Sequence, residues 1–209
     1  MNSRRLATLS IALFLCAASH SADKKKLVQS YKLNPDQVAE LTDVKLITAQ
    51  QNCENWAVAA GLAMMLRAQN VNLGQSFWVT RLSGGEVCSP NLPSVDAIAK
   101  EVNREFVLDD GRHVRVELNF TPGAPSQIDT IIAGLQRQQV SMLLWRGHAW
   151  YLSGLLYDEY IGLDGGRMFQ VKELRLANTF ARQPGAAFVR GRDDASEIGG
   201  VLSVGVTVL

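Results

Sequence analysis

The sequence predicts an α+β protein, with most of its helices in the first half and most of its strands in the second. Long apolar or helix-periodic segments dominate before residue 140, whereas shorter apolar segments separated by glycine turns follow it. Helices grouped ahead of strands are typical of α+β folds. With 209 residues, 47% of them hydrophobic, the chain is large enough for one domain with a sizeable core.

The first 22 residues have the pattern of a secretory signal peptide. Arg4 and Arg5 precede an apolar run at residues 6–18, and small residues follow it. The run is too short to span a bilayer comfortably. We therefore expect residues 23–209 to form one exported domain, periplasmic or extracellular, with no membrane contact after signal cleavage.

Charge and motif content exclude several function classes. Without Arg4 and Arg5 the chain has 19 basic and 20 acidic residues, and no basic stripe indicates nucleic-acid binding. Neither glycine pair, at residues 84–85 or 165–166, follows a strand and opens a helix, as a phosphate loop must. No cluster of Cys and His has metal-ligand spacing. We expect no nucleic acid, cofactor or metal.

Four helices are expected in the first half. The segment from residue 53 to about 68 is apolar almost all round, which predicts a buried central helix with Asn52 or Asn55 as its N-cap. Ser94 is placed to cap another helix. The remaining two are expected at residues 35–41, with Pro35 in the first turn, and at residues 73–82.

Strands are expected in the second half, with one more helix among them. Asp109, Asp110 and Gly111 read as the turn of a β-hairpin, and Ser126 as the cap of a helix that ends near residue 138. The apolar run at 140–145 predicts a central strand. The other expected strands are residues 106–108, 114–120, 148–157, 168–176 and 201–209, with an irregular excursion at 181–200.

Cys53 and His148 are the candidate catalytic pair. Cys nucleophiles and His bases are brought together by the fold rather than by the sequence. A helix that starts at Cys53 would favour its thiolate through the helix dipole. His148 begins an apolar strand, where a base could face a cleft, whereas His113 lies beside the Asp-Gly turn. This pairing predicts a thiol hydrolase.

Strand register supplies a third candidate, Asn178. If the hairpin turns around residues 163–165, the two residue numbers of each cross-strand pair add up to 326–328. His148 then lies opposite residues 178–180. The Asn178 amide oxygen would then accept the imidazole N–H and fix its tautomer. Asp164 lies at the far tip of this hairpin and is expected to be a turn residue.

These motifs, within residues 46–180, resemble the papain-like cysteine peptidase superfamily, especially its bacterial C39-like group. Residues 50–66 are similar to its oxyanion glutamine, nucleophile and central helix, and residues 147–149 and 176–180 to its histidine and asparagine segments. The resemblance implies a helical part, about residues 35–105, packed against a mostly antiparallel β-rich part at residues 106–209. It also implies hydrolysis of a protein or peptide by Cys53, His148 and Asn178, with Gln50 or Gln51 at the oxyanion. A related acyl transfer would use the same residues.

One departure from the family keeps an alternative open. In the family the nucleophile immediately precedes the Trp, but here Asn55 precedes Trp56. Cys53 then resembles the structural cysteine of papain relatives, bonded to a later cysteine such as Cys88. Two cysteines in an oxidising compartment also suggest one disulfide. The alternative is therefore a catalytically inactive papain-like binding module with a Cys53–Cys88 disulfide.

Overall fold

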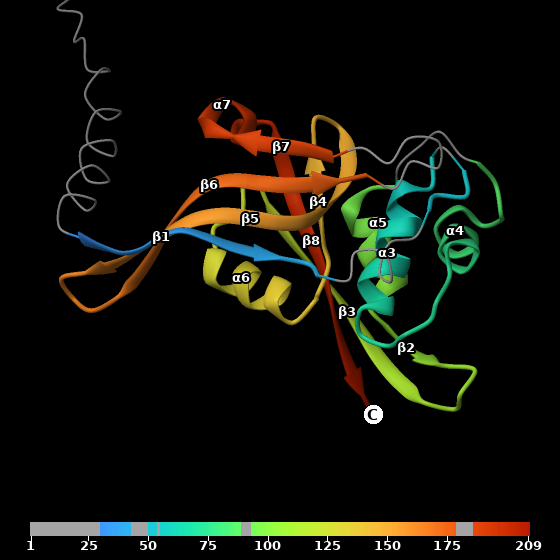
Figure 1. Cartoon of the computed structure of the whole chain (residues 1–209). Coiled ribbons are helices and arrows are strands. Elements are labelled where there is room, and N and C mark those ends of the chain that lie inside the picture. The colour runs from blue at the N-terminus through green and yellow to red at the C-terminus, as the bar shows by residue number, and fades with distance from the viewer. Residues whose placement is uncertain (1–29, 43–49, 54, 89–92, 179–185) are drawn as a thin grey trace, which may run out of the picture.

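The computed structural model describes residues 30–42, 50–53, 55–88, 93–178 and 186–209, so the expected signal peptide lies outside the described residues. The described residues form five helices and one eight-stranded sheet (Figure 1). All of the strand pairs are antiparallel. The predicted α+β class and antiparallel sheet are therefore confirmed.

The sheet joins strands from both halves of the chain. Its order is β2-β3-β8-β4-β5-β6-β7, and β1 also pairs with β5. The strands are β1 (Ser30–Glu40), β2 (Arg104–Val107), β3 (His113–Pro122), β4 (Ser141–Trp145), β5 (His148–Gly162), β6 (Arg167–Ala177), β7 (Ala186–Arg190) and β8 (Ile198–Val208). The helices are α3 (Ala57–Arg67), α4 (Gln75–Ser83), α5 (Val95–Val102), α6 (Ile128–Gln136) and α7 (Gly191–Ser196).

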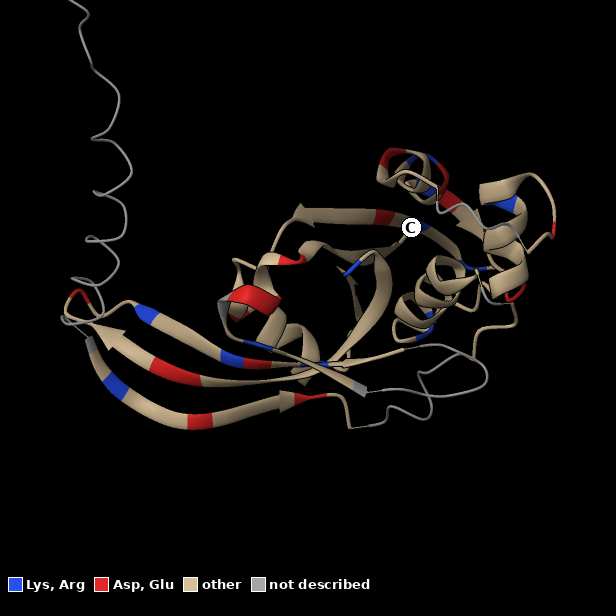
Figure 2. Cartoon of the chain, turned by 90° about the horizontal axis from the view of Figure 1, so that it is seen from above, with Lys and Arg blue, Asp and Glu red and all other residues tan. Residues whose placement is uncertain are grey.

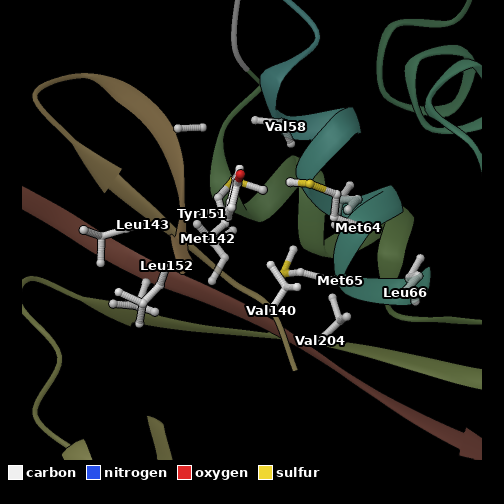
Figure 3. Packing of buried hydrophobic residues seen from close by; sticks show 14 of the residues in the cluster. Val58, Met64, Met65, Leu66, Val140, Met142, Leu143, Tyr151, Leu152 and Val204 are labelled. Atoms are coloured by element: carbon white, nitrogen blue, oxygen red, sulfur yellow. The ribbon is translucent and has the colours of Figure 1, made fainter. Parts of the chain in front are cut away.

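Helix α3 is the central buried helix that its composition predicts. Every residue from 58 to 66 is buried. The side chain of Met142 on β4 occupies the space over Gly61, so the helix lies directly against the sheet. Figure 3 shows Met65 beside Val140 and Val204, on the same side of the sheet. The apolar surface of α3 is thus covered all round, as a uniformly apolar helix requires.

The prediction of a helix at residues 35–41 is wrong, because this segment belongs to strand β1. Strand β5 is long enough to pair with β4 through its first residues and with β1 through the rest. Two register shifts flank Asn34, and Asp36 has a positive φ of 52°. This bulge accommodates Pro35, which no regular central strand would accept, and it hides the alternation of a strand.

Buried carboxylates of β5 hold the bulge in place. Asp158 accepts a hydrogen bond from the Asp36 N–H at 2.9 Å and ion pairs from Lys32 and Lys172 at 2.6 and 2.7 Å. Glu159 accepts a hydrogen bond from the Asn34 amide at 2.8 Å. Burial opposes ionisation of Asp158, but the hydrogen bonds from Lys172 and Lys32 outweigh it and hold its pKa well below the usual range. Basic residues of β1 and β6 thus flank the acidic residues of β5 in the arm that these strands form, which extends away from α3, α4 and α5 (Figures 1 and 2).

The hairpin of β5 and β6 has the predicted register. Tyr151 pairs with Ala177 and Ile161 with Arg167, so the two residue numbers of a pair add up to 328 at both ends of the ladder. Asp164 lies in the connecting turn, where its carboxylate accepts the Gly166 N–H at 3.0 Å. The interpretation of Asp164 as a turn residue is confirmed.

Most of the other elements match their predictions. Ser94 caps α5 by accepting the Ala97 N–H at 3.2 Å, and β2 and β3 form the expected hairpin. Helix α6 is shorter than predicted, and its N-cap is Gln127 rather than Ser126. The described part of the 181–200 excursion is regular, because it contains β7 and α7. Among the described residues, no helix is long and apolar enough to cross a membrane.

Candidate functional site

The two mature cysteines are joined. Cys53 and Cys88 form a disulfide across 35 residues of sequence, with their Cα atoms 5.9 Å apart. Cys53 is half-buried and packs against the core, whereas Cys88 is exposed. Because a thiolate is the nucleophilic form of cysteine, the disulfide leaves no nucleophile at residue 53. The structure thus contains the bond expected in the alternative interpretation.

The prediction that the central helix starts at Cys53 is wrong. Helix α3 begins at Ala57, its N-cap is Trp56, and no side chain caps it, so neither Asn52 nor Asn55 has that role. The Trp56 N–H instead closes a turn on the Cys53 carbonyl at 3.0 Å. The dipole effect falls off within the first turn of a helix, so the helix start offers Cys53 little stabilisation as a thiolate.

Neighbouring side chains fasten the loop around Cys53. Gln51 is buried, and its side-chain N–H donates to the Cys53 carbonyl at 2.8 Å. Gln75 of α4 donates to the Gln50 carbonyl at 2.6 Å and accepts the Asn52 N–H at 3.1 Å. The Gln51 amide thus bonds to the backbone of the loop, whereas an oxyanion donor would face a substrate. Gln75 was not predicted from the sequence, because a glutamine in the first turn of a helix has no distinguishing pattern.

Trp56 adds a second link between the two cysteine segments. Its indole N–H donates to the carbonyl of Val87 at 3.0 Å, next to Cys88. Trp56 itself is buried. Asn55 is exposed in the turn that precedes it.

His148 begins β5 directly after a two-residue turn. Arg146 and Gly147 form this turn with positive φ values of 52° and 73°, and His148 pairs with Trp145 across it. The imidazole is exposed. The predicted position of His148 at the start of a strand is therefore confirmed.

Strand alternation assigns His148 to one face of the sheet. Met142 packs on Gly61 of α3, and its partner on β5 is Tyr151. Paired residues share a face and successive residues alternate, so Trp145 and His148 lie on the opposite face. Figure 3 agrees, because Met142 and Tyr151 point toward α3 while Leu143 and Leu152 point away from it.

Asn178 lies near His148 at the same end of the β5–β6 ladder. It directly follows Ala177, the last residue of β6, which pairs with Tyr151. Continuing the register by one residue puts Asn178 opposite Trp150 and on the face that carries His148. Asn178 is half-buried, and the rest of its predicted motif, at residues 179–180, lies outside the described residues. The strand register thus places His148 and Asn178 on one face near the same end of the ladder, whereas Cys53 precedes α3, which packs on the other face.

Two cavities formed by described residues lie away from these candidate residues. One of about 400 Å³ lies between α6 and the strands β3, β8 and β4, and one of about 560 Å³ lies between α6 and the start of β6. Neither has Cys53, His148 or Asn178 in its lining. In the described parts of the chain, no group of three His, Cys, Asp or Glu side chains is placed to hold a metal ion.

The remaining buried charged groups have partners. Glu173 on β6 is paired with Arg190 at 2.6 Å and with Arg175 at 3.2 Å. Burial opposes its ionisation, but the hydrogen bonds from Arg190 and Arg175 prevail and lower its pKa. Such neutralised carboxylates fasten neighbouring strands and are poorly suited to proton transfer.

Comparisons with known proteins add no assignment. No model of a protein family matches this chain, and no curated protein is significantly similar to it.

Proposed function

We propose that this chain is an exported, non-catalytic binding module with a papain-like arrangement, locked by its disulfide. The observation that carries the proposal is the Cys53–Cys88 bond. A disulfide is compatible with export, because such bonds persist in oxidising compartments. Asn55 before Trp56 supports the same conclusion, since it removes the thiol from the family's nucleophile position.

The position of His148 also supports a module without peptidase chemistry. A base must come within hydrogen-bond reach of its nucleophile, directly or through one water. Strand alternation directs His148 to the face opposite α3, while Cys53 precedes α3 and bonds to Cys88. A peptidase would need both reduction of the disulfide and a rearrangement of one of these segments.

A thiol-directed peptidase probe tests the proposal. The exported protein is treated with a peptidyl chloromethyl ketone, which alkylates activated cysteines, before and after mild reduction. We expect no labelling before reduction, and afterwards slow labelling in which the half-buried Cys53 reacts no faster than the exposed Cys88.

Two variants make the test specific. Cys88→Ser frees Cys53 without a reductant, and His148→Gln removes the candidate base from that background. The proposal predicts the same slow labelling of Cys53 with and without His148. Rapid labelling of Cys53 that is lost in His148→Gln, accompanied by cleavage of a peptide substrate, would establish the peptidase instead.

A further inference from the structure

The last part of β8 has an unpaired edge. Residues 200–208 pair with β3 on one side, but on the other side β4 pairs only with residues 198–202. Among the described residues, no strand pairs with residues 204–208 on that second side. Figure 1 shows this end of β8 running down beside β3 alone.

The hydrogen bonds of β8 show which backbone groups face this edge. The Leu209 N–H donates to the His113 carbonyl at 2.9 Å, and the Gly199 carbonyl accepts the Gly123 N–H at 3.1 Å. Odd-numbered residues therefore point their N–H and C=O groups toward β3, and even-numbered residues point theirs away, since the antiparallel register between them is unbroken. The groups that face the open edge are those of Val204, Val206 and Val208.

One side chain already uses the start of this edge. Gln69, just after α3, donates to the Val204 carbonyl at 2.8 Å. This contact agrees with the alternation, because Val204 is even-numbered. Beyond it, the N–H and C=O of Val206 and Val208 remain as two donors and two acceptors, enough to pair with a short strand. The Val208 side chain is 63% exposed.

Strands β1 and β2, at two other edges of the sheet, have features that prevent edge pairing, and this edge of β8 has none of them. Strand β1 carries Lys32, Pro35 and the bulge at Asp36, and β2 is only four residues long. Natural proteins use charges, proline, bulges and short strands in this way to prevent edge pairing. Residues 204–208 read Val-Gly-Val-Thr-Val, with no charge and no proline.

A polar cavity adjoins the point where the edge becomes free. The cavity of about 400 Å³ between α6 and the sheet is lined in part by Ser203 and Val204 of β8 and by Gln139 and Ser141 at the start of β4. Of the described residues that line it, Arg137 alone is charged. The cavity can therefore take a side chain from a strand added to β8, and its guanidinium favours a carboxylate.

We propose that the free edge of β8 binds an extended peptide segment of a partner protein by strand addition, with an acidic side chain in the Arg137 cavity. This names the partner class of the binding module proposed above. In this mode the backbone hydrogen bonds provide affinity and a side-chain pocket provides specificity. A second copy of the chain would use the same edge but would leave the cavity unused, so a peptide accounts for more of the observations.

Amide hydrogen exchange with two synthetic peptides tests the proposal. The probes are Thr-Val-Glu-Val-Thr and Thr-Val-Gln-Val-Thr, with both ends blocked. Saturating peptide is expected to slow exchange of the Val206 and Val208 amides at least about tenfold, whereas the Gly205 and Thr207 amides are already protected by β3. Arg137→Gln should weaken the Glu peptide about tenfold and leave the Gln peptide unchanged.

Matched variants separate edge pairing from side-chain effects. Val206→Pro removes an outward N–H without removing a bond to β3, and Val206→Ile keeps that N–H. We expect Val206→Pro to abolish binding and Val206→Ile to retain it, with native circular dichroism in both.

Three results would overturn the proposal: unchanged binding by Val206→Pro, peptide-induced protection away from β8, or protection of Val206 that depends on protein concentration without peptide. The last would assign the edge to a second copy. None of them bears on the thiol labelling, so failure here is distinguishable from failure of the non-catalytic assignment.

Discussion

His148 pairs directly with Trp145 across the turn between β4 and β5, and both side chains lie on the face of the sheet opposite α3. Trp145 is fixed there, because its indole N–H donates to the Asp194 carbonyl of α7 at 3.0 Å and its ring meets Trp150 edge to face. A register shift that moved both residues to the other face would therefore disrupt the packing of a buried tryptophan. His148 and Trp145 thus share a face of the sheet that α3 does not cover.

The disulfide should contribute strongly to stability. The two cysteines are 35 residues apart in the sequence. For a loop of this length, the entropy that the cross-link removes from the unfolded chain predicts a stabilisation of about 3–4 kcal/mol. We expect Cys88→Ser to lower the free energy of unfolding by this amount in urea denaturation. Wild-type protein in reductant should have the same free energy of unfolding as the variant. If the oxidised wild type and the variant were equally stable, the bond would not be formed.

Packing of α3 on the sheet predicts different outcomes at two helical glycines. An added Cβ at Gly61 would overlap the end of the Met142 side chain, whereas at Gly134 of α6 it would meet only Gln139 at an ordinary 3.8 Å. Gly134→Ala should stabilise the protein by up to about 1 kcal/mol through helix propensity. Gly61→Ala should be less stable than Gly134→Ala by about 1–2 kcal/mol, because Met142 must move. Equal thermal stabilities of the two variants would contradict this packing.

The turn before His148 needs glycine for its backbone conformation and not for lack of space. Gly147 has a φ of 73°, and an added Cβ would meet nothing within 4 Å. Gly147→Ala should therefore cost about 1–2 kcal/mol, which is the penalty of a left-handed conformation. Gly85 has equally open surroundings without a positive φ, so Gly85→Ala is the matched control and should be neutral or slightly stabilising. A Gly147→Ala variant as stable as the control would show that this turn has another conformation.

Acid should loosen the β1 arm through Asp158. Its folded-state pKa lies below that of the unfolded chain, because the hydrogen bonds from Lys172 and Lys32 overcome the effect of burial. The stability that it contributes is complete above about pH 4, near the unfolded pKa, and is lost as the pH falls through the folded pKa. Asp158→Asn should therefore flatten the decline of the free energy of unfolding between about pH 5 and pH 2.

The matched control for this prediction is Asp129→Asn on α6, an exposed carboxylate outside the arm. It should leave the acid dependence as in the wild type. An Asp158→Asn variant with the full wild-type decline would show that the Lys32 and Lys172 contacts do not persist in solution.

Elements that depend on neighbouring residues could be predicted from the sequence. The unbroken apolar run predicted the buried helix α3, and the turn residues around Asp164 predicted the register of β5 and β6 to within two residues. The Ser94 cap was likewise predicted. In each case the signal lies within one segment or one hairpin, where periodicity and turn chemistry decide the structure.

Elements that depend on residues far away in the sequence could not be predicted from it. Strand β1 is held by Asp158 and Glu159, more than 120 residues away, and its bulge removes the alternation of a strand. The start of α3 was misplaced because Asn52 and Asn55 both suit a cap, whereas the cysteine loop is fixed instead by Gln75 and the disulfide. From the sequence, Cys53 was favoured as a nucleophile, with the disulfide as the alternative, whereas the structure joins Cys53 to Cys88. The face on which His148 lies could not be predicted, because it depends on the packing of Met142.

The most direct test of the central claim is the pH dependence of Cys53 alkylation in the Cys88→Ser variant, measured with and without His148→Gln. A non-catalytic module should have an ordinary thiol at Cys53, with an alkylation rate that rises only near about pH 8 and above and is the same in both backgrounds. A Cys53 that reacts rapidly below pH 7, and only when His148 is present, would show a thiolate–imidazolium pair and contradict the non-catalytic assignment.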